Sequence, residues 1–240
     1  MFARALRWGA SLAVLYFVMG TAVAGSFSVD PVRLVLTTDA PIVALAIRNS
    51  GAEAAVIQLE PTSWTQKDGA DLYEPTRDLI ATPPIFTLPP HGTQIVRLGL
   101  RRASDPRAEL SYRLYLVEVP PPPPPDFVGT RVALRLGVPV FVTPATASAQ
   151  TLQWQLVRRP DSKLAIAVRN HGALHARIES VSLSRNDGAA VSGQTIADDV
   201  HAGQERQWLI QGSAMPAPGS TLRLSASTER GNVSADVVVP

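Results

Sequence analysis

Short alternating apolar runs, separated by turn residues, constrain the fold of this chain most strongly. Between Val132 and Val142 an apolar side chain occupies every second position. The same period recurs in Ile42–Arg48, Gln94–Leu100 and Tyr112–Val119. Side chains of a strand alternate between its two faces, so this period predicts half-buried β-strands, and no long helical period competes with it. With turn sequences such as KDGAD at Lys67–Asp71 between the runs, we expect an all-β protein built from immunoglobulin-like sandwiches.

The pattern runs twice along the chain. The segment LAIAVRNHGALHARI (Leu164–Ile178) repeats the plan of VALAIRNSGAEAAVI (Val43–Ile57): a strand that ends in Arg-Asn, a glycine turn and a second strand. Between the copies, Thr143–Thr151 is small and polar, as a linker would be. We therefore predict two domains in tandem, residues 25–144 and 145–240.

The first 24 residues have the composition of a signal peptide. Arg4 and Arg7 precede a short apolar stretch, Ser11–Met19, and Ala22–Val23–Ala24 is a small-x-small cleavage sequence. The stretch is too short to span a bilayer as a helix, so an uncleaved anchor is the less favoured alternative. We expect an exported protein that begins at Gly25 and has no integral membrane span after cleavage.

Charge and composition exclude several classes of partner and chemistry. The chain has 22 Lys+Arg and 20 Asp+Glu, and removal of the two arginines in residues 1–24 leaves a formal net charge of zero. No compact basic run remains, so nucleic-acid binding is not expected. The absence of cysteine excludes disulfides, thiol catalysis and zinc–thiolate sites.

No other motif indicates a metal, a cofactor or an enzyme. His171 and His175 have the spacing of metal ligands on a helix, but NHGALH lies between two predicted strands, where that spacing does not align two imidazoles. There is no Gly-x-Ser-x-Gly elbow and no phosphate-binding glycine loop. The acidic doublet Asp198–Asp199 is interpreted as part of a solvated loop.

Two features remain for a binding function. Pro139 lies inside the most regular alternating run, and because proline cannot donate a ladder hydrogen bond, it predicts an edge strand. The preceding prolines, Pro120 to Pro125, either keep the loop from pairing or form a plain surface spacer.

Arg33 lies among apolar neighbours in VDPVRLVLT, and two interpretations stay open. Its stem packs while its head reaches water, or its guanidinium is held for a carboxylate.

Several motifs, in order and at matching separations, resemble one family. They are VDPVR at Val29–Arg33, IATPPIFTLPPHGTQIVRL at Ile80–Leu98, YRLYLVEVPP at Tyr112–Pro121 and VALRLGVPVFVTP at Val132–Pro144. Over residues 26–144 the chain resembles the PapD-like periplasmic chaperones of the chaperone–usher pilus pathway. The resemblance implies a periplasmic protein with two domains at an angle, which holds pilus subunits in the cleft and delivers them to an outer-membrane usher.

The resemblance also implies site residues. The edge strand would enter the open groove of a subunit, with Val132, Leu134, Leu136 and Val138 pointing out of the chaperone's own core. Arg33 corresponds to the family arginine that grips the carboxylate at the subunit's C-terminus, but the family's second cation, a lysine, is Pro139 here. Either another cation, such as Arg135 or Arg97, takes the place of this lysine, or the subunit terminus is held otherwise. Thr143 stands where the family has a basic residue that helps to fix the two domains, so the sequence does not predict that salt bridge. The alternative is a PapD-like envelope binding module or adhesin that does not serve pilus subunits.

Overall fold

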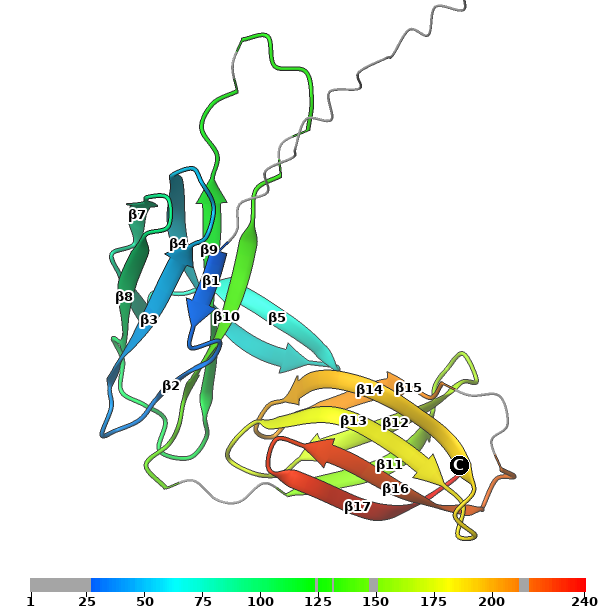
Figure 1. Ribbon diagram of the computed structural model, residues 1–240. Coiled ribbons are helices and arrows are strands. Elements are labelled where there is room, and N and C mark those ends of the chain that lie inside the picture. The colour runs from blue at the N-terminus through cyan, green and yellow to red at the C-terminus, as the bar shows by residue number, and fades with distance from the viewer. Residues whose placement is uncertain (1–26, 124, 131, 147–150, 212–215) are drawn as a thin grey trace, which may run out of the picture.

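The computed structural model describes residues 27–123, 125–130, 132–146, 151–211 and 216–240. Within these ranges it contains seventeen β-strands and no helix, so the predicted all-β class is confirmed. None of the described segments is a helix long and apolar enough to cross a membrane. The strands form two sandwiches joined at an angle, one upright and one lying below and to the right in Figure 1.

The N-terminal sandwich has two sheets. One has the order β1-β3-β8-β6 and the other the order β2-β10-β9-β4-β5, with β7 paired to β4. The first sheet consists of β1 (Phe27–Asp30), β3 (Ile42–Asn49), β8 (Thr93–Leu100) and β6 (Leu79–Thr82). The second consists of β2 (Leu34–Leu36), β10 (Arg135–Val142), β9 (Leu110–Val119), β4 (Ala55–Lys67), β5 (Ala70–Pro75) and β7 (Ile85–Leu88).

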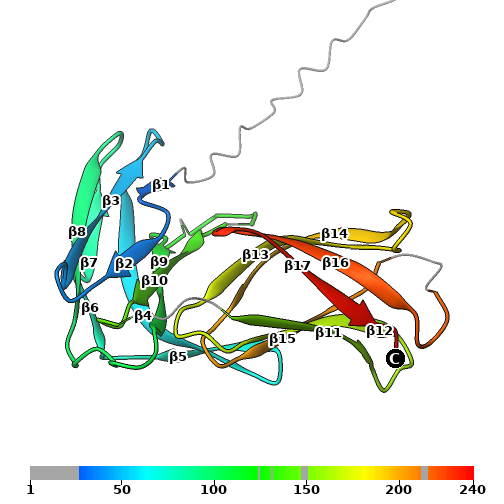
Figure 2. The ribbon, with the colours of Figure 1, turned by 90° about the horizontal axis from the view of Figure 1, so that it is seen from below.

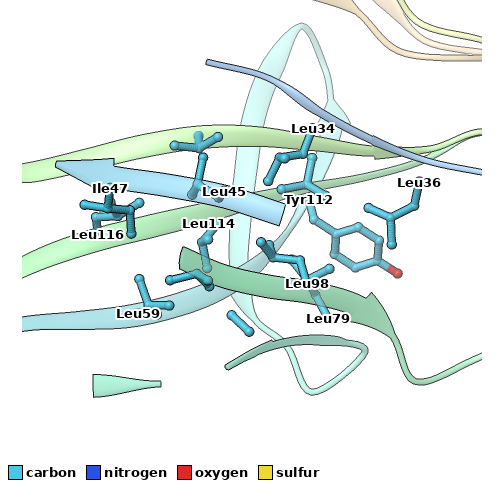
Figure 3. Packing of buried hydrophobic residues seen from close by; sticks show 14 of the residues in the cluster. Leu34, Leu36, Leu45, Ile47, Leu59, Leu79, Leu98, Tyr112, Leu114 and Leu116 are labelled. Carbon is cyan, nitrogen blue, oxygen red and sulfur yellow. The ribbon is translucent and has the colours of Figure 1, made fainter. Parts of the chain in front are cut away.

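The alternating positions of these strands fill the space between the two sheets (Figure 3). Leu45 and Ile47 of β3 face Leu114 and Leu116 of β9, and all four side chains are buried. Burial of one such side chain contributes about 1.5–3 kcal/mol, which explains how a cysteine-free domain of this size is held together. The period of two in the sequence therefore corresponds directly to the core.

The C-terminal sandwich is smaller. Its three-stranded sheet contains β11 (Leu152–Arg158), β12 (Leu164–Asn170) and β15 (Glu205–Leu209). Its four-stranded sheet contains β14 (Ala190–Val200), β13 (Ala176–Ser184), β16 (Thr221–Thr228) and β17 (Gly231–Val238). A separate core lies between these sheets, centred on Ile166, Ile178 and Leu224.

The two copies of the Arg-Asn repeat adopt the same turn. Asn49 ends β3, its Nδ2 donates to the carbonyl of Glu53 at 2.7 Å, and its Oδ1 accepts from the amide of Gly51. Asn170 ends β12 and makes the equivalent bonds at the start of its own turn, to the carbonyl of Leu174 at 2.8 Å and from the amide of Gly172. Both asparagines are buried, so their hydrogen bonds replace water for the turn backbone. The sequence repeat is thus a repeat of one structural device.

The hairpin β4–β5 reaches from the N-terminal sandwich to the C-terminal one, as both views show (Figures 1 and 2). Its turn places Asp68 and Gly69 at φ 53° and 77°, the left-handed conformation that an Asp-Gly hairpin turn requires. The carbonyl of Gly69 at the tip accepts from Arg206 of β15 at 2.6 Å. The predicted KDGAD turn therefore forms an inter-domain contact.

Some predicted boundaries change in the structure. The sequence also predicts short strands at Val32–Thr37 and Ala55–Leu59, but the first is a strand only at Leu34–Leu36 and the second is the beginning of the longer β4. Strand β14 was not predicted, because its apolar residues do not alternate regularly. The expected domain boundary at residues 144/145 lies between β10 and β11. The expected signal peptide, residues 1–24, lies outside the described residues.

Candidate functional site: the edge strand β10 and the inner-angle face

The strand β10 is paired unequally on its two sides. Along its whole length it pairs with β9, from Arg135 opposite Val117 to Val142 opposite Leu110. On the other side β2 pairs with it in parallel, but over Val140–Val142 alone. Among the described residues, no strand pairs with the second side of β10 from Arg135 to Pro139. The edge predicted from Pro139 is confirmed, and it is the first half of the strand that is available to a partner.

The side chains predicted to face a partner divide into two groups. Val132 is 71% exposed, Leu136 is 39% exposed and Leu134 is half-buried. Val138, in contrast, is 1% exposed and belongs with Val140 to the core of the N-terminal sandwich. The prediction for Val138 is wrong, because the alternating face is continuous and the core of the N-terminal sandwich covers its second half.

Between the two sheets an apolar pocket of about 210 Å³ opens beside the first half of β10. Leu134 and Leu136 line it, together with Phe27 of β1 and Leu116 of β9. The segment before β10 is tied to β9 at this point, since Glu118 accepts from the amide of Leu134 through Oε2 at 3.0 Å and donates its own amide to the carbonyl of Leu134 at 2.9 Å. The edge is therefore held in an extended form.

The outward side of the sheet that contains β10 faces the C-terminal domain, and we call it the inner-angle face. It carries Arg33, Trp64, Tyr73, Arg113, Tyr115, Arg135 and Phe141. An open depression of about 730 Å³ lies on it between Tyr73, Tyr115 and Arg135. The face is thus rich in aromatic rings and guanidinium groups.

Arg33 lies beside β10 at the inner edge of this face. The parallel pairing of Leu34 with Val140 puts Arg33 at the level of Pro139. Its guanidinium lies 5.9 Å from the ring centroid of Phe141, and its Nη1 donates to Oε2 of Glu229 in the C-terminal domain at 2.5 Å. The side chain is 36% exposed. The guanidinium is therefore held against a carboxylate that belongs to the protein's own C-terminal domain.

Neither cation suggested as the second anchor lies near Arg33. Arg135 is four residues before Pro139 on β10, roughly 13 Å along the strand. It stacks on Tyr115 at 3.6 Å and pairs with Glu60 at 3.3 Å. Arg97 is on β8 in the other sheet.

Arg113 is the cation that lies on the inner-angle face beside Pro139. It lies on β9 directly opposite Pro139, so its side chain and that of Pro139 share the inner-angle face. Its guanidinium stacks on Trp64 at 4.3 Å and lies 5.3 Å from Tyr73. Its Nε is buried and has no hydrogen-bond partner in the described part of the chain. The alternation of β9 predicts this face, but not that β9 and β10 pair in this register.

Gly137 leaves space for the side chains of Arg113 and Tyr115. A Cβ at this position would meet Arg113 Cδ and a Tyr115 ring carbon, each at 3.0 Å. Partial burial raises the pKa of the Tyr73 hydroxyl to about 12, against the opposing effect of Arg113. A carboxylate placed here would meet a guanidinium in a partly desolvated site, where such pairs are strongest.

A network of buried polar groups fixes the angle between the domains. Arg206 is 7% exposed, and its Nη2 pairs with Asp71 of β5 at 2.6 Å and with Asp198 of β14 at 3.0 Å. Gln66 of β4 donates to the carbonyl of Asp199 and accepts from the amide of His201. The missing basic residue at Thr143 is therefore compensated by a different set of inter-domain contacts.

The charges in this network shift the pKa of an acid in it. Burial alone would raise the pKa of Asp71, but hydrogen bonds from Trp64, Gln66 and Arg206 outweigh it, and the pKa of that carboxyl is lowered. Asp71 is thus ionised at neutral pH and stabilises the interface.

Two interpretations of polar residues in the C-terminal domain need correction. Asp198 and Asp199 do not lie in a solvated loop: both belong to β14, and Asp199 is 5% exposed and pairs with Arg177 at 2.8 Å. His171 and His175 lie in the turn between β12 and β13, as expected, but His175 is 6% exposed and stacks on Phe141 at 3.7 Å. Among the described residues no group of three or more possible ligands could hold a metal ion.

Comparisons with known proteins show which solved structures share this fold. Three solved structures share the fold: the CsuC–CsuE chaperone–tip adhesion subunit complex of archaic Csu pili from Acinetobacter baumannii, the SafA pilin–SafB chaperone complex from Salmonella enterica, and the CupB2 chaperone of Pseudomonas aeruginosa. The first is 17% identical and covers 88% of this chain and 98% of its own, with a TM-score of 0.68. The second is 15% identical, covers 90% and 98%, and has a TM-score of 0.61. The third is 18% identical, covers 87% and 97%, and has a TM-score of 0.56.

A search of curated proteins finds no match. The family model for the N-terminal domain of the PapD-type pili and flagellar-assembly chaperones matches residues 26–148, which is more than half of the chain. The protein therefore belongs to the PapD-like family of pilus-assembly chaperones.

Proposed function

We propose that this protein is a periplasmic chaperone that holds pilus subunits by donor-strand complementation and delivers them to an outer-membrane usher. The observation that carries the proposal is the edge of β10 from Arg135 to Pro139, which no described strand covers on its second side. A subunit that lacks a strand would add its own sheet to this edge through main-chain hydrogen bonds.

The side chains for such a groove are Val132, Leu134 and Leu136. Each aliphatic side chain contributes about 1.5–3 kcal/mol on burial, so the three contribute roughly 4.5–9 kcal/mol before the cost of ordering is subtracted. The pocket beside Leu134 and Leu136 belongs to the same edge, so a partner strand would also cover this opening in the sandwich.

For the carboxylate of the subunit's C-terminus, we propose Arg33 together with Arg113. The two residues flank Pro139 across three neighbouring chain segments, which places their backbones roughly 10 Å apart. Two long arginine side chains on one face can reach a carboxylate between them. In this arrangement Arg113 replaces the family lysine, and Arg135 lies farther along the strand.

Coexpression with the pilus subunits of the same organism tests the edge. A Val132→Glu/Leu136→Glu double variant would force carboxylates into an apolar groove, so we expect it to capture no subunit and to keep the fold. Ile95→Glu is the matched control, because Ile95 is 44% exposed on the other sheet. Equal capture by wild type and the double variant would refute the donor edge.

The anchor needs a second experiment. A charge-assisted hydrogen bond is worth about 1.5–3 kcal/mol, so Arg33→Ala and Arg113→Ala should each weaken subunit binding roughly 10- to 100-fold. Arg102→Ala, which removes an exposed ion pair to Asp78, is the control. An Arg113→Ala variant that binds as wild type does would assign the second cation elsewhere.

The alternative, a PapD-like envelope binding module or adhesin, predicts another outcome. Such a protein would form no complex with pilus subunits. It would still bind its own ligand in the Val132→Glu/Leu136→Glu variant, whose β10 edge is charged. N-terminal sequencing of the exported protein tests the compartment, and we expect it to start at or near Gly25.

A further inference from the structure

The proposed anchor is already occupied by a carboxylate of the protein itself. Glu229 lies in the turn between β16 and β17, in the C-terminal domain, and its Oε2 accepts from Nη1 of Arg33. The partners are 196 residues apart in sequence, so the pair joins the two domains directly. The side chain of Glu229 is 20% exposed, so its carboxylate is partly removed from water, although the residue as a whole is exposed.

The turn holds Glu229 in this position. Its amide donates to the carbonyl of Arg177 at 3.2 Å, and the Oγ1 of Thr228 donates to the carbonyl of Gly231 at 2.7 Å. Gly231 has φ 115°, a conformation that other residues rarely adopt, so the turn is specified by sequence. The carboxylate is thus presented to Arg33 by a fixed backbone.

A second group lies beside the other oxygen of Glu229. Its Oε1 lies 3.5 Å from Nε2 of His175, and Nδ1 of the same ring lies 2.6 Å from Oε1 of Glu109 in the N-terminal domain. The imidazole stacks on Phe141, the ring above which Arg33 also lies. When Arg33 is taken by another carboxylate, Glu229 retains this neighbour on its own domain.

We propose that Glu229 is an internal competitor for the carboxylate anchor: it occupies Arg33 in the free protein and is displaced when a peptide C-terminal carboxylate binds. The inference rests on the proposed role of Arg33. Two carboxylates cannot both take the same donors of one guanidinium without repelling each other. Linkage is reciprocal, so removal of the Glu229 charge strengthens ligand binding by the factor by which ligand binding weakens the Arg33–Glu229 contact.

Nuclear magnetic resonance of the exported full chain, labelled with ¹⁵N-arginine, measures this competition. The probe is N-acetylglycine, which carries the carboxylate of a peptide C-terminus, and N-acetylglycinamide is its neutral control. The Nε–Hε signal of Arg33, assigned with an Arg33→Lys variant, reports binding. A partly exposed ion pair changes an equilibrium by about fivefold, so we expect Glu229→Gln to bind N-acetylglycine about fivefold more tightly than wild type.

Asp236→Asn is the matched variant. Asp236 lies on β17, close in sequence to the same turn, and pairs with the exposed Arg223 rather than with Arg33. Tighter binding by Glu229→Gln alone supports the proposal. Equal affinity of wild type and Glu229→Gln overturns the competition and leaves Arg33 as a carboxylate site, and tighter binding by both variants overturns it as a general charge effect. No response of Arg33 in any protein overturns both this inference and the proposed anchor.

Discussion

Acidification should destabilise this protein through one buried histidine, His201. The residue follows β14, is 6% exposed, and meets Trp64 of the N-terminal domain edge-on, with the ring centroids 4.4 Å apart. Burial lowers its pKa from the ordinary value of 6.5 to about 3, while Asp71 opposes the shift and His175, Arg206 and Arg113 add to it. Between these two pKa values the unfolded chain binds a proton that the folded protein does not.

The size of the effect follows from the two pKa values. The folded protein loses about 1.4 kcal/mol for each pH unit between them as the pH falls. Acidification from about pH 7 to about pH 4.5 should therefore remove about 2.5 kcal/mol through His201 alone, and below about pH 3 the loss levels off. For a chain of this length, that is a fall in melting temperature of about 5–10 °C.

A variant separates this residue from the other titrating groups. His201→Leu removes the titration and leaves a side chain of similar size, and His171→Leu makes the same change at an exposed turn position. Urea unfolding, followed by tryptophan fluorescence, gives the free energy of unfolding at each pH. Between about pH 7 and about pH 4.5, wild type should lose about 2.5 kcal/mol more of this free energy than His201→Leu. Parallel pH profiles of wild type and His201→Leu would refute the reasoning.

Two further outcomes follow from the interface and the edge strand. Arg206→Met should cost about 3 kcal/mol, because Asp71 and Asp198 would lose a buried partner, and calorimetry should show the two domains melting separately; a single unchanged transition would contradict this. Val138→Asp should unfold the N-terminal domain, because it buries an unpaired charge, whereas Val132→Asp on the same face should leave the melting temperature within about 1 °C of wild type. Circular dichroism gives the melting temperatures of the two variants. Equal falls in melting temperature would show that the core extends along the whole segment from Val132 to Val138.

The proposed donor strand shows where sequence reasoning ends. Its period of two and the proline at Pro139 correctly predicted a strand at a sheet edge, because both depend on local backbone chemistry. The same period could not tell Leu136 from Val138. Parity fixes the face on which a side chain lies, but the length of the facing sheet decides how far along the strand the core extends.

The anchor shows the same limit across strands. Arg33 was proposed from its motif, but Arg113 and Glu229 were not, because contacts between segments far apart in the sequence bring them to the same face. Asp199 likewise became an interface residue because Gln66 of the hairpin β4–β5 donates to its carbonyl, and Asp198 is joined to the hairpin through Arg206.

The sequence by itself determined the all-β class, the Asp-Gly turn of the hairpin and the duplicated Asn49 and Asn170 turns. Each of these depends on residues close together in the chain, where alternation and turn chemistry act directly. The tertiary structure decided which half of β10 has no strand paired on its second side, which arginine shares the inner-angle face with Arg33 and which carboxylate binds the Arg33 guanidinium. These features depend on strand register and on the angle between two domains, and both are set by the packing of residues far apart in the sequence.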